Sequence, residues 1–191
     1  RVRKRRPKHH EELTVSKIVI INLEQQPDRM RSVLQALAGT SLPIERFNAL
    51  TAEDADREHV QQWACPAKTL GCFLSHRSVA QSMKEDEKSV VLVLEDDVFP
   101  VLPASELQDA VEKCVGAARP GWDILLLNTA GWCGCTEGEH PGRLCGSAAA
   151  YLLSPSGARK LSGLEHAWHV DVIRNSDLFD VRLGPTLFGT H

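Results

Sequence analysis

Residues 90–100 read VVLVLEDDVFP, and this stretch decides the fold. Its first five residues are apolar and mostly β-branched, which is typical of a strand buried on both faces of a sheet. Three carboxylates follow at once, at Glu95, Asp96 and Asp97. Because unpaired charges are costly in a protein core, we expect the acids just beyond the carboxyl end of the strand. Open α/β sheets bind their ligands at that edge.

The spacing of the three acids suggests what they could bind. Alternation along an extended chain predicts Glu95 and Asp97 on one side and Asp96 on the other. A Glu-x-Asp pair of this kind can hold a hard divalent cation through oxygen. A strand that simply ends in solvated acids is the alternative, and the triplet alone favours it because short acidic motifs are common.

Length and charge divide the chain into a basic arm and an acidic body. The 191 residues, 42% of them hydrophobic, predict one globular domain. Six of the first ten residues are basic, so the net charge of −3 divides into +6 for this head and −9 for the rest. The head lacks interleaved aromatic residues, so we interpret residues 1–16 as a flexible, solvated arm or stem and expect no nucleic-acid partner. Residues 17–191 form the predicted domain.

Targeting signals are not visible in this sequence. It contains no apolar run of signal-peptide or transmembrane length, and it does not begin with Met. We therefore expect membrane contact only through an anchor outside this sequence.

The cysteines indicate the redox compartment. There are six, at Cys65, Cys72, Cys114, Cys133, Cys135 and Cys145. An even number permits three bridges, and the Cys133-Gly-Cys135 spacing is not that of a structural zinc site. We predict at least one disulfide, within the region of Cys133, Cys135 and Cys145 or joining it to Cys65 or Cys72, and an oxidising compartment. Six scattered free thiols are the alternative.

Strand and helix patterns alternate along the chain, as in α/β folds. Strands are predicted at 17–23, 44–48, 90–94, 122–127 and 148–153, and helices at 25–37, 52–63, 69–83, 105–114 and 155–161. The first strand, short loop and helix resemble a nucleotide-binding opening. Arg29 and Arg31 lie in the first helical turns, where one of them could grip a diphosphate, or both could be solvated.

The helix predicted over 69–83 carries two polar residues within its apolar stripe, Ser75 and His76. A single histidine in such a helix is more often a hydrogen-bonded structural residue than a catalyst.

Several motifs occur together in one order. They are Asn22-Leu23 with Asp28-Arg29, Gly71-Cys72 with Ser75-His76, residues 94–98, Trp122-Asp123, Ala150-Tyr151 through Leu161, and Val170-Asp171. This combination resembles glycosyltransferase family 25, which contains lipooligosaccharide and procollagen galactosyltransferases. The resemblance implies a GT-A-like, nucleotide-sugar-binding mixed α/β sheet of Rossmann-like type, flanked by helices. It also implies a UDP-sugar donor, usually of galactose, manganese (Mn²⁺) as cofactor, and inversion at the anomeric carbon.

Site residues follow from the resemblance and from the chemistry. Donor contacts are expected at Asn22, Leu23, Arg29, Ser75 and Asp96, and metal ligands at Asp97, Glu95 and His191. Inverting transfer also needs a base for the acceptor hydroxyl. Asp171 is the candidate because a metal-bound carboxylate is a poor base, and His76 is its competitor. The acceptor would be a hydroxyl of a glycan or a protein, in the lumen of the ER or Golgi if the source is eukaryotic and otherwise in the cytoplasm or at a membrane.

Two other classes of protein would account for some of these sequence motifs. A catalytically silent binding protein on the same scaffold would lack metal binding, and an intact Asp97 argues against it. A receiver-like signalling domain also pairs an acidic cluster with a later buried strand. Its phosphorylated Asp would correspond here to Asn128, which cannot accept phosphate.

Overall fold

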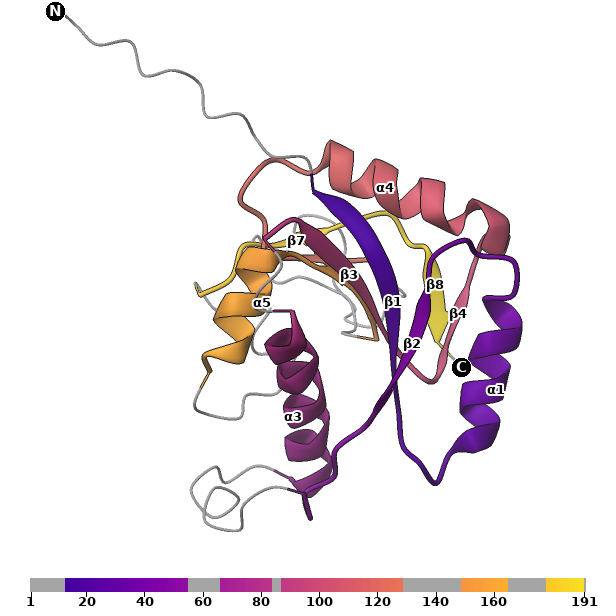
Figure 1. The fold of residues 1–191 in the computed structure, drawn as a ribbon, viewed down its shortest axis with the longest axis vertical. Helices are drawn as coiled ribbons and strands as arrows, with labels where there is room; N and C mark the ends of the chain where they lie inside the picture. The colour runs from indigo at the N-terminus through magenta and orange to yellow at the C-terminus, as the bar shows by residue number, and fades with distance from the viewer. Residues whose placement is uncertain (1–12, 55–65, 84–86, 129–148, 165–177, 191) are drawn as a thin grey trace, which may run out of the picture.

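The computed structural model describes residues 13–54, 66–83, 87–128, 149–164 and 178–190 (Figure 1). Within these ranges, six strands form one sheet in the order β2-β1-β3-β6-β5-β7. Their bounds, in that order, are β2 Ile44–Asn48, β1 Thr14–Asn22, β3 Ser89–Glu95, β6 Ala150–Leu153, β5 Ile124–Leu126 and β7 Val181–Leu183. The predicted α/β class with a mixed sheet and the central position of residues 90–94 are confirmed.

The directions of the strands bring several strand ends to one edge. β1 pairs in parallel with both β2 and β3, whereas β6 runs antiparallel to β3 and to β5. Glu95, at the end of β3, lies opposite Ile21, and Asn22 lies opposite Asn48. The polar residues that terminate β1, β2 and β3 therefore meet at one edge of the sheet.

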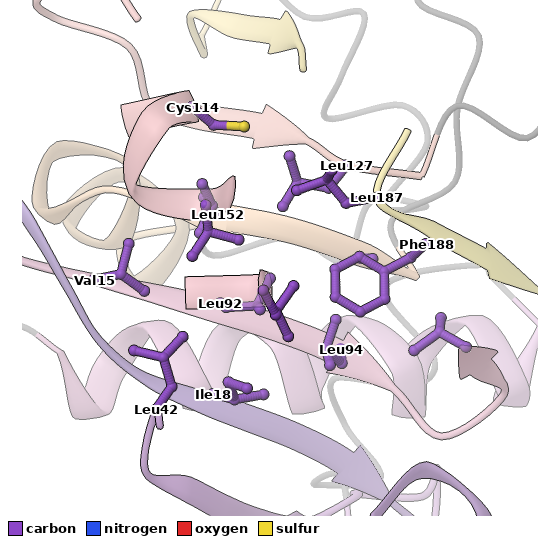
Figure 2. Packing of buried hydrophobic residues seen from close by; sticks show 14 of the residues in the cluster. Val15, Ile18, Leu42, Leu92, Leu94, Cys114, Leu127, Leu152, Leu187 and Phe188 are labelled. Carbon is purple, nitrogen blue, oxygen red and sulfur yellow. The ribbon is translucent and has the colours of Figure 1, made fainter. Parts of the chain in front are cut away.

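Helices cover both faces of the sheet. The core below α1 (Pro27–Ala36) and α4 (Leu107–Ala117) takes in Leu92 and Leu94 of β3. The core below α3 (Ala67–Ser82) and α5 (Pro155–Ser162) takes in Val91 and Val93. Figure 2 shows part of the first cluster, where Leu92 and Leu94 lie near Leu152, Leu187 and Phe188. β3 is thus apolar on both faces because each face is covered by helices.

A two-stranded sheet follows the acidic turn and was not predicted. β4 (Val98–Pro100) pairs antiparallel with β8 (Phe188–Thr190), and Val98 lies opposite Thr190. Each strand has three residues, too few for a periodic signal. This pairing brings the carboxyl-terminal part of the described chain next to the residue that follows Asp97.

Two sequence-based boundaries need correction. β1 begins at Thr14, so the predicted arm of residues 1–16 overlaps the sheet. The alternation of exposed and buried residues there was too short to detect, and only Val15 points into the core. The helix predicted from Ser105 begins two residues later, as α4 at Leu107. Ser105 lies in the 3₁₀ turn η1 (Ala104–Glu106), and the residue preceding α4 is Glu106, without a side-chain cap.

Some predictions lie outside the described residues. They include most of the helix predicted over 52–63 and the region of Cys133, Cys135 and Cys145, where a disulfide is expected. The two cysteines within the described ranges are Cys72 and Cys114. Cys114 is free and buried, and the thiol of Cys72 donates to Glu95, so the disulfide prediction remains open for the other four.

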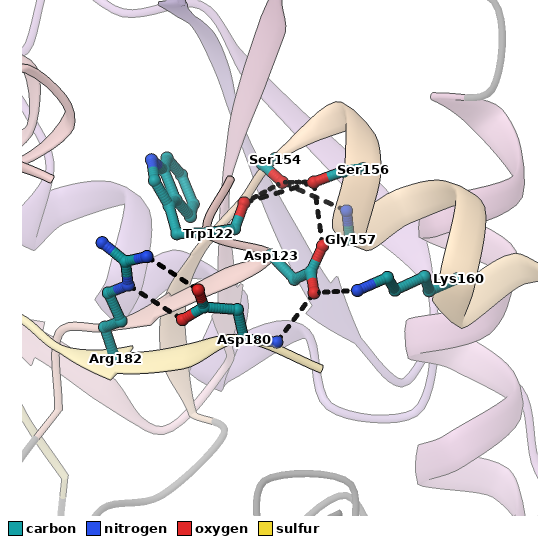
Figure 3. Close-up of polar contacts among 8 residues, drawn as sticks. All are labelled: Trp122, Asp123, Ser154, Ser156, Gly157, Lys160, Asp180 and Arg182. Atoms are coloured by element: carbon teal, nitrogen blue, oxygen red, sulfur yellow. Dashed lines mark hydrogen bonds and ion pairs between the residues drawn. The ribbon is translucent and has the colours of Figure 1, made fainter. Parts of the chain in front are cut away.

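A buried carboxylate joins three elements at the opposite edge of the sheet (Figure 3). Asp123, fully buried at the start of β5, accepts hydrogen bonds from Ser156 Oγ at 2.8 Å and from the backbone N–H of Asp180 at 2.8 Å. It also pairs with Lys160, whose side chain is 46% exposed. Gly157 lies so close that an added Cβ would be 2.3 Å from the carbonyl oxygen of Asp123. Asp123 therefore ties β5, α5 and the segment before β7 together.

We predict that Asp123→Ala lowers the free energy of unfolding by about 2–3 kcal/mol, because it leaves buried donors without an acceptor. Urea unfolding monitored by circular dichroism measures the change. Glu45→Gln is the control, since the Lys17–Glu45 pair is exposed and should contribute less than about 1 kcal/mol. Equal losses in the two variants would contradict a structural role for Asp123.

Candidate functional site

The acids that follow β3 occupy a tight turn. β3 ends at Glu95 and β4 begins at Val98, so Asp96 and Asp97 are turn residues. The predicted side-to-side alternation therefore stops at Glu95. Each of the three carboxylates has a different environment, set by the element that it faces.

Asp96 faces β1 and α1. Its Oδ2 accepts a hydrogen bond of 2.7 Å from Asn22 Nδ2, and its Oδ1 lies 3.2 Å from Arg29 Nη1. Asn22 is buried and also donates to the backbone carbonyl of Gln26, while its Oδ1 accepts from Arg46 Nε at 3.0 Å. The side chain of Arg29 remains 55% exposed. Asn22, Arg29 and Asp96, predicted as donor contacts, are thus brought together.

Glu95 faces α3. Its Oε1 lies 3.2 Å from His76 Nε2 and 3.7 Å from the thiol of Cys72, and Nδ1 of His76 lies 2.7 Å from the hydroxyl of Tyr151. Burial by itself would raise the pKa of Glu95, but the hydrogen bond and charge of His76, with the bond from Cys72, lower it overall. Burial, with the charges of Cys72 and Glu95, holds the pKa of Tyr151 well above its ordinary value of 10.0, so Tyr151 keeps its proton.

Asp97 is the carboxylate that these contacts do not satisfy. Its Oδ1 is buried and has no hydrogen-bond partner among the described residues. Burial raises the pKa of Asp97, the neighbouring charges of Glu95 and Asp96 raise it further, and Arg29 offsets only part of this. An unpartnered, buried carboxylate oxygen beside two other acids is a fitting ligand for a hard cation, whose charge would relieve the repulsion.

Two other predicted donor contacts lie apart from this cluster. Ser75 is buried, and its hydroxyl donates to the carbonyl of Gly71 and accepts from the N–H of Leu50. Those bonds join α3 to the loop after β2. Leu23 is half-buried, and its carbonyl accepts from the N–H of Gln26 in the turn before α1.

The predicted base Asp171 and the predicted metal ligand His191 lie outside the described residues. Arg31, the other arginine considered for the diphosphate, pairs with Asp28 on the exposed side of α1. Arg29 is therefore the arginine that reaches the acidic turn.

Three participants were not among the predicted site residues: Tyr151 and Cys72, which the sequence showed only within motifs, and Arg46. Tyr151 is the only tyrosine of the chain and interrupts an apolar strand. A buried hydroxyl needs a partner, and this was the available signal. Arg46 carried no comparable signal, because its role depends on the pairing of β2 with β1.

Comparisons with known proteins agree with this arrangement. The sequence profile of glycosyltransferase family 25 (LPS biosynthesis protein) matches residues 15–117, which include Asn22, Arg29, His76 and the acidic turn. The structure is that of an α/β protein with an acidic turn at the carboxyl end of its central strand. The chain belongs to glycosyltransferase family 25, and this assignment removes the receiver-like alternative.

Individual members of the family share 30% or less of their residues with the matched part of this chain. A glycosyltransferase 25 family member of Drosophila pseudoobscura pseudoobscura is 30% identical over 101 residues, which are 45% of this chain and 16% of that protein. Mouse procollagen galactosyltransferase 2 is 25% identical over 137 residues, 63% of this chain and 22% of that protein. The chain thus spans about a fifth of the length of these relatives. A solved glycosyltransferase involved in the glycosylation of the major capsid of PBCV-1 is 11% identical, with a TM-score of 0.47, over 85% of this chain and 68% of that one.

We predict that Asp97→Asn raises the melting temperature of the metal-free protein at neutral pH, because it removes a charge that burial and two neighbouring acids disfavour. A raised folded-state pKa means that the carboxylate destabilises the folded protein above that pKa. The advantage of Asn should therefore shrink as pH falls towards 3.8, the ordinary value for Asp, where the wild-type group is protonated.

Thermal unfolding in chelator at several pH values measures this difference. Asp54→Asn is the matched control with the opposite sign. Hydrogen bonds from the backbone and hydroxyl of Thr51 lower the pKa of Asp54, so its loss should destabilise the protein at neutral pH. An Asp97→Asn protein less stable than wild type in chelator would contradict the prediction.

Proposed function

We propose that the chain is the catalytic part of a metal-dependent glycosyltransferase that transfers a hexose, most simply galactose, from a UDP-sugar to a hydroxyl acceptor, with inversion. The observation that carries the proposal is the buried Oδ1 of Asp97 at the carboxyl edge of β3, which has no hydrogen-bond partner in the part of the chain that the structure describes. Family membership supports the reaction class, and the name of the mouse relative supports galactose as the sugar.

Asp97 would be the principal metal ligand. Asp96 already accepts bonds on both oxygens, and Glu95 directs Oε1 at His76, so these two acids would assist from their second lone pairs or through water. His191 remains a proposed ligand, supported by the pairing of Thr190 with Val98, the residue after Asp97. When bound, a divalent cation such as Mn²⁺ would stabilise the charge that develops on the leaving diphosphate.

The side chains around the turn would orient the donor. Asn22 and Arg29 hold Asp96 in place, so the turn is fixed before a ligand arrives. Arg29 keeps exposed N–H groups near the first turn of α1, where a diphosphate oxygen could accept them. Leu23, in the turn between β1 and α1, would border the nucleotide.

Asp171 is the proposed base that removes the proton of the acceptor hydroxyl. His76 is less suited to that role, since both of its ring nitrogens are engaged, by Tyr151 and Glu95, and its side chain is buried. The acceptor would be a hydroxyl of a glycan or of a protein side chain.

The many cysteines support a location in the lumen of the secretory pathway. No helix among the described residues is both long and apolar enough to cross a bilayer.

A catalytically silent relative is the competing proposal. It would keep the fold and the Asn22–Asp96 contact but would not bind a metal–nucleotide pair. The unrelieved charge at Asp97 favours an active enzyme, because a protein without metal would gain stability from losing that carboxylate.

We predict that UDP binds in the presence of Mn²⁺ and that Asp97→Asn abolishes this binding. Isothermal calorimetry with UDP, in Mn²⁺ and in chelator, is the direct measurement. Asp28→Asn is the control, since Asp28 is an exposed acid of α1 that pairs with Arg31. Equal affinity for UDP in chelator and in Mn²⁺ would reject the metal assignment.

We also predict that Asp171→Asn retains UDP binding but loses transfer by roughly 10²-fold or more, the usual scale for a general base. A screen of UDP-sugars against glycan and hydroxylated peptide acceptors, read by product mass, supplies the assay. Asp180→Asn is the control, because Asp180 is an exposed acid paired with Arg182. Near-normal turnover in Asp171→Asn would move the base elsewhere, and no product with any donor would favour the silent relative.

A further inference from the structure

A second set of possible metal ligands lies between α3 and β3, on the side of the turn away from Asp96. Cys72 and His76 are four residues apart on α3 and therefore share one face of the helix. Glu95 reaches this face from the end of β3. One ligand atom from each of the three residues lies within 4.8 Å of the other two.

Two of the three distances between these atoms, both to Glu95 Oε1, are close to those of a tetrahedral site. With bonds of about 2.3 Å to sulfur and about 2.0–2.1 Å to nitrogen and oxygen, tetrahedral coordination separates nitrogen from oxygen by about 3.3 Å and sulfur from oxygen by about 3.5 Å. The corresponding distances are 3.2 Å from His76 Nε2 and 3.7 Å from Cys72 Sγ, both measured to Glu95 Oε1. A cation could be bound here with only small side-chain movements.

We propose that Cys72, His76 and Glu95 form a binding site for a zinc-class divalent cation. A thiolate with an imidazole selects Zn²⁺ or Co²⁺, whereas Mn²⁺ and Mg²⁺ prefer oxygen ligands such as those at Asp97. Three protein ligands leave the fourth position of a tetrahedral ion open to water or to a bound ligand. The inference does not rest on the proposed function, because the thiol and the imidazole come from α3 and take no part in that proposal. Glu95 is the one residue common to both, and it faces α3 with Oε1.

The surroundings of His76 suit a metal ligand. Histidines that bind metal through one ring nitrogen usually donate from the other to an oxygen, and His76 Nδ1 lies 2.7 Å from the hydroxyl of Tyr151. Binding through Nε2 places the imidazole proton on Nδ1, facing Tyr151. Cys72 gives up its thiol proton to solvent, so each cation bound releases at least one proton.

The burial of the three side chains determines how a cation would reach this site. His76 is buried, while Cys72 and Glu95 are only half-buried, so a cation would enter past these two side chains. Once bound, it would crosslink α3 to the end of β3. The crosslink would add a second support to the turn, on the side opposite the contacts of Asp96 with Asn22 and Arg29.

Titration of the metal-stripped, reduced protein with Co²⁺ tests this site. We expect one Co²⁺ per chain with a thiolate-to-cobalt charge-transfer band, which Zn²⁺ displaces and excess Mg²⁺ does not. Cys72→Ser should abolish the band. Cys114→Ser, which removes the other described cysteine, and Asp97→Asn should both retain it.

Two further measurements distinguish the loss of a metal ligand from the loss of the fold. Circular dichroism compares the fold of each variant with wild type, and Glu95→Gln, which keeps the thiol, should weaken Co²⁺ binding at least about 10-fold. A Cys72→Ser protein that is folded and keeps the band at unchanged intensity would overturn the proposal. Absence of any thiolate band in the wild-type protein would overturn it as well.

Discussion

The rest of the structure depends on the burial of β3 on both of its faces. Val90 to Leu94 are almost completely excluded from solvent, because α1 and α4 cover one face of the strand and α3 and α5 the other. No carboxylate could be accommodated in this strand without a partner. The charges of the chain therefore begin where the strand ends, and the acidic turn lies at the edge where β1 and β2 also terminate.

Each acid of the turn is defined by its neighbours. Asp96 is neutralised by Arg29 and fixed by Asn22, and Glu95 is engaged by His76 and Cys72. Asp97 lies beside these two acids, with a buried oxygen that lacks a partner among the described residues. A site that holds one carboxylate at a cost in stability is what a cation-binding turn requires, since the ion then relieves the repulsion.

The opposite edge of the sheet has a structural rather than a chemical role. Asp123 is as buried as the core residues, but its oxygens accept from Ser156, Lys160 and the backbone of Asp180. These bonds fix α5 against the start of β5 and set the position of β7. The same class of side chain is thus satisfied at one edge of the sheet and left unsatisfied at the other.

The sequence by itself determined the class of fold, the central strand and the edge at which the acids gather, because these follow from apolar runs and from the cost of burying charge. Through the resemblance to family 25 it also named Asn22, Arg29 and Asp96 as donor contacts, although not their contacts with one another. Only the tertiary structure decided that Glu95 turns to α3, that Tyr151 supports His76, and that β8 pairs with β4 beside Asp97. These contacts join residues 19 to 92 positions apart. Local periodicity carries no information at such separations, since strand order and helix placement decide which side chains meet.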